Sequence, residues 1–432
     1  MNVDTPLIQK IEDVSVPGPT SSLPISILSL AATILGACAV TIPYATRVST
    51  PLAFSAVLIF VGLASMLSFS FLIRAMDATS KKTYRELAVS AYGPGMGKFN
   101  EVVLVIYTGC GATSGVVLVG DLLPRLLRVW LPHTVWTSRG FVVPVIALAV
   151  MLPLSLPRSL GGLRYAALGA IVCLAVTWGV LLASLVEDGD HGELDEVEMR
   201  PSVALAFPIL IVALMGQYQV CPAYQELENK SPARMYVVVG AATGIAMTVY
   251  AAYGAVGFAR FGDNTLPDVL NNFATKWKPA IVSRFLLGIC VVCWYPLPLF
   301  AMRQNLHSLL FGSAPSPAEG GGEVEYGEDG DVVVRIPAVR NVGLTLLCVV
   351  ITNGLALVTP NVAVVLGFSG GTGGVALMYV LPALFFLKLV PDGGPGMRFL
   401  AYVLMVFGVL GGLVSNVVNV LMLCGDRGYF LS

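Results

Sequence analysis

Apolar runs of about 20 residues, the length that a helix needs to cross the hydrocarbon core of a bilayer, recur along almost the whole chain. They are separated by short polar stretches that carry Gly, Pro or charged residues. The pattern predicts an all-α polytopic membrane protein with eleven transmembrane helices. The predicted segments are 22–46, 51–74, 98–123, 139–156, 163–186, 202–222, 233–259, 280–303, 338–359, 362–389 and 398–423.

The composition supports the membrane assignment. Of the 432 residues, 56% are hydrophobic and 12% are charged, and the mean hydropathy is +0.81. A soluble domain carries about 25% charged residues, so this chain has too few to cover a water-soluble particle. The net charge of -1 argues against nucleic acid as a partner. The 8 cysteines lie in or at the ends of apolar runs, so we expect no disulfide framework, no metal and no cofactor.

The distribution of Lys and Arg in the loops predicts the orientation in the membrane. The stretch 74–98 carries five basic residues, more than any other predicted loop, which indicates that this loop and the N-terminus face the cytosol. The acidic stretch 187–198 then lies outside. We expect a cytosolic N-terminal tail (1–21), one transmembrane domain (22–423) that contains a cytosolic linker (312–337), and a short external C-terminal tail (424–432). A plasma membrane and a lysosome- or vacuole-like membrane both fit.

The first predicted segment carries residues that interrupt a helix. Within Ser26–Tyr44 lie Gly36, Thr41 and Pro43, where an ordinary spanning helix would carry bulky apolar side chains. Gly weakens a helix interior, and Pro removes a backbone donor and clashes with the preceding turn. In hydrocarbon such a break is tolerated only where it is buried in protein or lines a wet cavity. We therefore predict a broken helix that forms part of a binding site.

A second interruption lies five segments later, in Phe207–Leu227. Gly216 and Pro222 flank the polar triplet 217–219 (Gln-Tyr-Gln) in an otherwise apolar run. Polar side chains at this depth usually face a cavity or another helix, and interhelical hydrogen bonds of roughly 1 kcal/mol each remain an alternative explanation. Paired breaks in the two halves of a chain are typical of a transporter site at the bilayer midplane. Opposite half-helix ends attract a carboxylate and a cation, a combination that suits a zwitterion.

Enzyme motifs are missing from the sequence. It contains no P-loop, no H-E-x-x-H, no G-x-S-x-G and no pair of intramembrane carboxylates, so we do not expect an enzyme. The three histidines fall in predicted loops or at a segment end, which excludes a mid-membrane histidine proton relay.

Seven motifs follow one another in order over nearly the whole chain. They are 34–44 (ILGACAVTIPY), 120–124 (GDLLP), 152–161 (LPLSLPRSLG), 222–227 (PAYQEL), 260–265 with 268–272 (RFGDNT and DVLNN), 300–303 (FAMR) and 381–385 (LPALF). Together they resemble the amino acid/auxin permease family, especially its neutral amino acid transporter and protozoan amino acid transporter branches. The resemblance implies a LeuT-type 5+5 inverted repeat with broken helices one and six. It also implies secondary active transport of amino acids by alternating access.

The sequence departs from this resemblance at the positions that concern the coupling ion. Ala32 stands where sodium-coupled members look to use an asparagine, and residues 292–294 (Val-Cys-Trp) in segment eight provide no hydroxyl before Tyr295. Gln217 replaces the histidine that many members carry in segment six. Because a sodium site needs hard oxygen ligands, backbone carbonyls would have to hold sodium alone. We favour a proton as the coupling ion, or uncoupled exchange, over sodium symport.

The resemblance also implies which residues hold the substrate. Backbone around the break in segment one would bind the carboxylate and the amine, and residues from the second break would face it. The expected substrate-binding residues are Ile34, Leu35, Gly36, Ala37, Cys38, Thr41, Tyr107, Met215, Gly216, Gln217, Tyr218, Trp294 and Ser369. None is acidic, which favours neutral amino acids, although aromatic faces can also hold an Arg or Lys side chain. The alternative is a non-transporting amino acid sensor on the same fold, which the short predicted tails disfavour.

Overall fold

The computed structural model describes residues 21–131, 134–157, 164–188, 203–312, 325–326, 332–333, 337–359 and 361–425. The predicted N-terminal tail before Ser21, the acidic stretch after residue 188, most of the linker 312–337 and the C-terminal tail after residue 425 lie outside the described residues.

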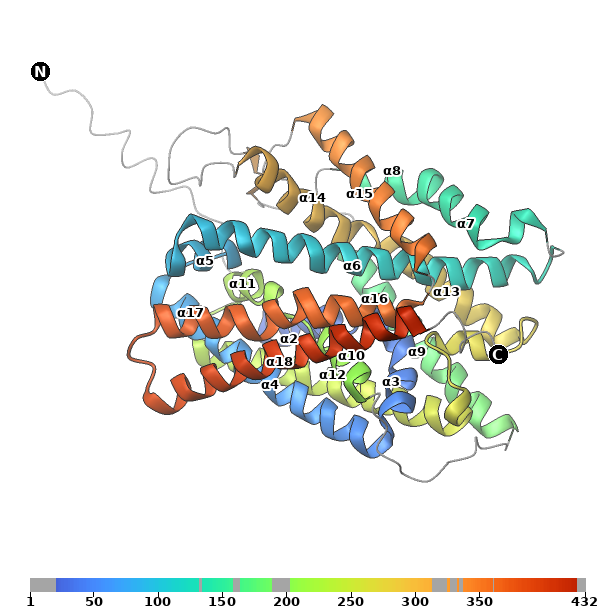
Figure 1. The fold of residues 1–432 in the computed structure, drawn as a ribbon, viewed down its shortest axis with the longest axis horizontal. Helices are drawn as coiled ribbons and strands as arrows, with labels where there is room; N and C mark the ends of the chain where they lie inside the picture. The colour runs from blue at the N-terminus through green and yellow to red at the C-terminus, as the bar shows by residue number, and fades with distance from the viewer. Residues whose placement is uncertain are drawn as a thin grey trace, which may run out of the picture.

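Long helices packed side by side form the body of the molecule (Figure 1). In chain order the α-helices are α2 (Leu23–Ile34), α3 (Ile42–Ser49), α4 (Pro51–Thr79), α5 (Tyr84–Tyr92), α6 (Pro94–Leu127), α7 (Arg139–Ile146), α8 (Leu152–Ser155), α9 (Arg164–Asp188), α10 (Val203–Ala213), α11 (Gln217–Glu226), α12 (Pro232–Phe261), α13 (Lys278–Trp294), α14 (Pro296–Phe311), α15 (Ala338–Val358), α16 (Val362–Ser369), α17 (Leu381–Leu389) and α18 (Pro395–Gly425). Shorter helical turns are η1 (Ala37–Thr41), η2 (Val135–Thr137), η3 (Ala147–Met151), η5 (Gly262–Asn264), η6 (Val269–Asn272), η8 (Gly370–Gly374) and η9 (Ala376–Val380). One antiparallel pair, β1 (Glu325–Tyr326) with β2 (Val332–Val333), lies within the predicted linker.

The helices begin and end where local chemistry requires it. Proline occupies the first or second position of α2, α4, α6 and α12, where a backbone N–H has no intrahelical partner. The side chain of Ser231 accepts a hydrogen bond from the N–H of Arg234 at 3.3 Å and caps α12. Gly93 joins α5 to α6 with φ 82°, a left-handed conformation that favours glycine.

Among the described residues, 8 helices are long and apolar enough to cross a membrane. The bent pair Leu23–Ile34 and Cys38–Ser49 makes a ninth span if the two pieces are counted together. Two further apolar helices, Arg139–Ser155 and Ile171–Val186, are shorter than the rest. The prediction of an all-helical membrane protein is confirmed, whereas the count of eleven helices stays a prediction.

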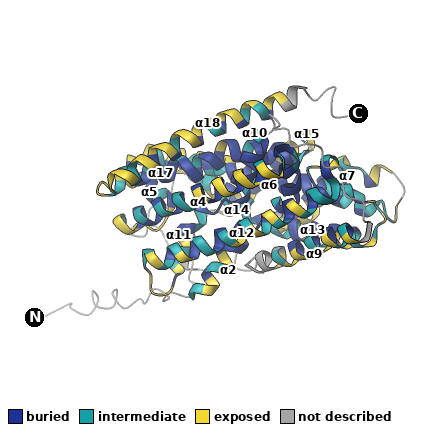
Figure 2. Cartoon of the chain, turned by 90° about the horizontal axis from the view of Figure 1, so that it is seen from below, coloured by how far each residue is buried: buried dark blue, intermediate teal, exposed yellow. Residues whose placement is uncertain are grey.

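Large apolar side chains are exposed along the outer helices, as the yellow segments of α18 and its neighbours show (Figure 2). Phe399, Leu410 and Leu421 on α18, and Val350 and Val358 on α15, are all more than half exposed. A soluble monomer rarely leaves so much contiguous apolar surface in water. These faces fit the acyl chains of lipids, so the chain is a multi-pass membrane protein.

Both predicted breaks are present in the structure. The axes of Leu23–Ile34 and Cys38–Ser49 differ by 51°. Between them Leu35 (φ -74°, ψ 84°) and Gly36 (φ -102°, ψ -179°) leave the helical conformation. The second interruption separates α10 from α11, where Gly216 adopts φ -148° and ψ 0°. Each break frees backbone N–H and C=O groups from their intrahelical partners.

Elements five segments apart pack on one another. Helix α4 packs on α12 and α6 packs on α14, which pairs segments two and three with segments seven and eight. In the broken helices the pairing is crossed, because α2 packs on α11 and α3 packs on α10. This arrangement is the one that an inverted repeat produces, and it places the two breaks beside each other.

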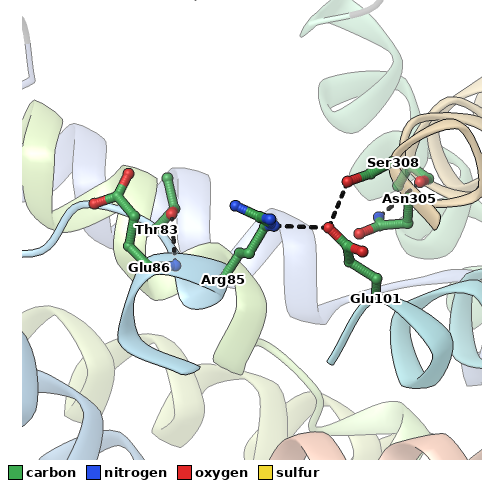
Figure 3. A network of polar contacts seen from close by, with 7 residues as sticks. Thr83, Arg85, Glu86, Glu101, Asn305 and Ser308 are labelled. Atoms are coloured by element: carbon green, nitrogen blue, oxygen red, sulfur yellow. Dashed lines mark hydrogen bonds and ion pairs between the residues drawn. The ribbon is translucent and has the colours of Figure 1, made fainter. Parts of the chain in front are cut away.

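A polar network fixes the short helix α5 against the bundle (Figure 3). Thr83 caps α5 by accepting a hydrogen bond from the N–H of Glu86. Nε of Arg85 donates to Oε1 of Glu101 at 2.7 Å, and the hydroxyl of Ser308 donates to the same oxygen at 2.6 Å. The network therefore joins α5, α6 and α14 through the buried carboxylate of Glu101.

Candidate functional site

The first break is bonded to a tyrosine from a distant helix. The hydroxyl of Tyr250, a fully buried residue of α12, donates to the carbonyl oxygen of Ile34 at 2.8 Å. It accepts from the N–H of Gly36 at 3.4 Å and lies 3.6 Å from Sγ of Cys38. One hydroxyl thus bonds the backbone on both sides of the break. Sequence reasoning missed Tyr250, which stands in an ordinary apolar run without any flanking signal.

The side chain of Gln217, the residue that follows Gly216, makes two hydrogen bonds at the second break. Oε1 of Gln217 accepts from the N–H of Gly216 at 3.1 Å, and its Nε2 donates to the hydroxyl of Ser65 in α4 at 2.9 Å. Gln217 and Ser65 are both fully buried. The amide therefore makes the interhelical hydrogen bond that the sequence left open as the alternative explanation.

The two breaks are in contact. A Cβ atom placed on Gly216 would lie 3.1 Å from Cγ1 of Ile34 and 3.3 Å from Cζ of Phe69, so the side chain of Ile34 packs directly on the Gly216 backbone. Met215 and Leu35 are buried beside them. Residues predicted from two stretches about 180 positions apart in the sequence are therefore brought together at one place.

Further polar side chains surround the first break. The rings of Tyr107 in α6 and Tyr218 in α11 lie 6.0 Å apart, tilted by 60°. The hydroxyl of Thr41 in η1 is buried and has no hydrogen-bond partner among the described residues. A hydroxyl can donate and accept, so this group can bond either end of a zwitterion.

Three predicted residues have a less direct place in the site. Ser369 is buried at the end of α16, which packs on η1. The ring of Trp294 packs on α6, because a Cβ atom on Gly115 would lie 3.6 Å from its Cζ3. This contact places Trp294 in the interface of α6 and α13. Ala37 begins η1, and its side chain lies outside the described residues.

The positions that bear on a coupling ion are apolar or already bonded. Ala32 is buried in α2. The hydroxyl of Tyr295, which follows the apolar triplet 292–294, shares a 2.8 Å hydrogen bond with the hydroxyl of Thr352 in α15. Within the described part of the chain, no group of three His, Cys, Asp or Glu side chains could hold a metal ion.

A comparison with protein families assigns the chain to one of them. The family model described as "Transmembrane amino acid transporter protein" matches residues 19–422. The chain belongs to this amino acid transporter family. The family comprises transporters and not enzymes, in agreement with the sequence prediction.

Relatives within the transporter family are similar over most of their length. The amino acid transporter AVT6E of Arabidopsis thaliana is 22% identical over 423 residues, covering 91% of this chain and 82% of the relative. The sodium-coupled neutral amino acid transporter 7 of Xenopus laevis is 26% identical over 328 residues, covering 74% and 70%. The putative sodium-coupled neutral amino acid transporter 11 of Danio rerio is 24% identical over 415 residues, covering 94% and 87%.

A solved structure confirms the fold of this family member. A mutant of the Eremococcus coleocola manganese transporter superposes with a TM-score of 0.58 over 100% of this chain and 91% of the other, at 11% sequence identity. At this identity the likeness concerns the fold alone. The predicted LeuT-type fold with broken helices one and six is confirmed.

Proposed function

We propose that this protein carries amino acids across a membrane by alternating access, with the substrate bound at the two breaks. The main support is the geometry of the first break. The single hydroxyl of Tyr250 bonds its backbone on both sides, and the side chain of Ile34 packs on Gly216 of the second break. The relatives named as amino acid transporters support this class of substrate.

The polarity of the backbone at the first break suits a zwitterion. The C-terminal end of α2 at Ile34 presents carbonyl groups and a partial negative charge, which favours the substrate ammonium group. The N-terminal end of η1 at Ala37 presents N–H groups and a partial positive charge, which favours the carboxylate. The hydroxyl of Thr41, which has no partner in the described part of the chain, supplies one more hydrogen bond inside the same turn.

The substrate side chain faces aromatic and small groups. Tyr218 directly follows the second break, and the ring of Tyr107 lies 6.0 Å from its ring. None of the predicted binding residues is acidic. A buried cationic side chain without a carboxylate partner would be costly, so we favour neutral amino acids. An Arg or Lys side chain over the faces of the two tyrosines is the alternative.

We favour a proton, or no ion, as the coupling partner. Although two of the relatives described above are named as sodium-coupled, Ala32 and the triplet 292–294 offer no oxygen ligand from their side chains. The hydroxyl of Tyr295 is shared with Thr352. Since sodium prefers hard oxygen ligands, this chain lacks side-chain ligands at the positions where the sequence resemblance implies them.

The proposed topology has a cytosolic N-terminus and an external C-terminus. The basic loop that contains α5 and the network of Arg85 with Glu101 would then lie at the cytosolic ends of α6 and α14. The loop between α12 and α13 would lie at the external end. A plasma membrane and a lysosome- or vacuole-like membrane both fit this topology.

Uptake by the purified protein in liposomes tests the proposal. Each amino acid is offered with an imposed sodium gradient, an imposed pH gradient, or neither. Uptake of a neutral amino acid that a pH gradient stimulates, or that needs no gradient, is the expected result. Sodium-stimulated uptake without a response to pH would overturn the coupling proposal. Saturable binding without flux would replace the transporter with a sensor on the same fold.

A further inference from the structure

The loop between α12 and α13, residues 265–277, covers the first break from one end of the bundle. Its helical turn η6 packs on η1 and also on α6 and α13. Nη1 of Arg47 in α3 donates to the carbonyl of Thr265 at 3.0 Å, and Nη1 of Arg125 in α6 donates to the carbonyl of Asn271 at 3.2 Å. The loop is thus attached both to the broken helix and to the helix that carries Tyr107.

The two terminal nitrogens of the arginine beneath this loop donate to backbone carbonyls, whereas its Nε is buried without a partner among the described residues. Arg284 of α13 is fully buried, and its Nη2 donates to the carbonyls of Leu270 and Phe273 at 2.9 and 2.7 Å. Its Nη1 makes longer bonds of 3.4 Å to the carbonyls of Ala274 and Thr275. The guanidinium therefore holds the loop backbone, and it makes no hydrogen bond to a carboxylate in the described part of the chain.

Asp268 in the same loop has a buried carboxylate, and one of its oxygens accepts no hydrogen bond from the described residues. Its side chain is 1% exposed, and Oδ1 accepts from the N–H of Leu270 at 3.1 Å. Oδ2 is buried and has no hydrogen-bond partner among the described residues. Burying a charged carboxylate with one oxygen that accepts no hydrogen bond is costly. Burying the neutral carboxylic acid costs much less.

The charged and titratable neighbours of Asp268 come from each element that η6 contacts. Helix α6 contributes Asp121 and Arg125, and α13 contributes Arg284. The titratable residue of η1 is Cys38, whose thiol lies 3.6 Å from the hydroxyl of Tyr250. Asp121 is itself paired with Arg139 of α7, at 2.6 Å from Nη1. Burial and the charge of Asp121 raise the pKa of Asp268 to about 7, against the opposing effects of the Leu270 N–H and the two arginines of α6 and α13.

The turn η6, which follows Asp268, carries an acceptor for a protonated carboxyl. Oδ1 of Asn271, three residues further on, is a second buried atom without a hydrogen-bond partner in the described structure. Asp268 is the N-cap of η6, and the N–H of Asn271 donates to its carbonyl oxygen at 2.9 Å, so one turn joins the two residues. With a proton on Oδ2, Asp268 becomes a hydrogen-bond donor, and Oδ1 of Asn271 stays an acceptor.

We propose that Asp268 is a proton-binding site, and that its neutral form keeps the 265–277 loop packed on the first break, so that transport follows the protonation of this carboxyl. The proposal rests on the proposed transport function. Because the packed loop binds the proton more tightly than a solvated aspartate does, acidic pH favours the packed loop. Uptake should therefore be faster below neutral pH than above it.

The test measures initial uptake in liposomes with the same pH on both faces, which removes both the pH gradient and the dependence on protein orientation. A group that titrates near pH 7 loses about tenfold of its protonated fraction between pH 6 and pH 8, and wild-type uptake should fall by up to that factor. Asp268→Asn mimics the neutral form and should make uptake independent of pH. The matched control, Asp263→Asn, removes a partly exposed carboxylate in the preceding turn η5 and should keep the wild-type profile.

Each outcome decides a separate question. A wild-type pH profile in Asp268→Asn, or wild-type uptake that is flat with pH, overturns the proton site and leaves the transport function standing. Absence of uptake of every amino acid by the wild-type protein overturns the transport function, and the proton site with it. If Asp268→Asn does not fold, Asp268→Glu replaces it: we expect a pH profile with a displaced midpoint, and an unchanged midpoint contradicts the proposal.

Discussion

Replacing Tyr250 by phenylalanine removes one oxygen atom and keeps the buried ring. The lost hydroxyl bonds the carbonyl of Ile34 and the N–H of Gly36 on either side of the first break. No other change in the described site acts so directly on the backbone of this break without altering its own residues. We expect substrate affinity to fall, because the hydroxyl holds the break in one conformation.

The magnitude follows from the two hydrogen bonds. The bond to Ile34, at 2.8 Å, is short, and the bond from Gly36, at 3.4 Å, is long. A buried acceptor that loses its donor costs about 1–3 kcal/mol. If this whole cost falls on the bound state, substrate affinity weakens by about 5- to 150-fold. We therefore expect the KM of uptake by Tyr250→Phe to rise by at least about fivefold.

Tyr253→Phe is a matched control on the same helix. Tyr253 is also buried, and its hydroxyl donates to the backbone carbonyl of Leu174 in α9, which belongs to neither break. Both variants should lose thermal stability in detergent to a similar degree. KM should rise in Tyr250→Phe and stay within about twofold of wild type in Tyr253→Phe. An equal rise in both variants, or none in Tyr250→Phe, would refute a local role of this hydroxyl at the substrate site.

Three further substitutions test the site and the supports around it. Gly36→Val should abolish uptake and leave folding intact, because only Sγ of Cys38, at 3.9 Å, lies within 4 Å of a new Cβ atom; wild-type uptake would remove this residue from the site. Glu101→Ala should lower the unfolding free energy by about 1–3 kcal/mol, seen as a lower thermal midpoint in detergent, since it breaks the bonds that join α5, α6 and α14; an unchanged midpoint would contradict this role. Arg284→Lys should lower the unfolding free energy by at least about 2 kcal/mol, because an ammonium group lacks the planar fork that reaches several carbonyls. A wild-type thermal midpoint in detergent would show that the 265–277 loop does not depend on this guanidinium.

Much of the fold could be predicted because its signals are local. An apolar run long enough to cross the bilayer is visible within about 20 residues, and the breaks at Gly36 and Gly216 are marked by Gly, Pro and polar residues nearby. The number of spans depends on more than these local signals. The segment that contains α7, η3 and α8 ends in short helical pieces at Ser155, and such details depend on packing against neighbours.

The site was predictable only in part, because its decisive bonds are not local. Tyr250 bonds Gly36 across 214 positions of the sequence, and nothing in the residues around it distinguishes it from other buried tyrosines. Gln217 shows the opposite case. Its polarity was visible in the sequence, but its partner Ser65 lies 152 positions away, so the interhelical bond could be seen only in the structure. Asp268 belongs to a motif that the sequence showed, yet its burial and its bare oxygen could be seen only in three dimensions.

The two breaks differ in a way that bears on how the transporter would work. At the second break, the side chain of Gln217 bonds the N–H of Gly216 and the hydroxyl of Ser65 in α4. The first break depends on α12, through Tyr250, and the same helix ends at Phe261, just before the loop that carries Asp268. A displacement of α12 relative to α2 would therefore strain the bond at the break and the packing of the loop together. In our proposal this helix connects proton binding at one end of the bundle to the substrate backbone site at its centre.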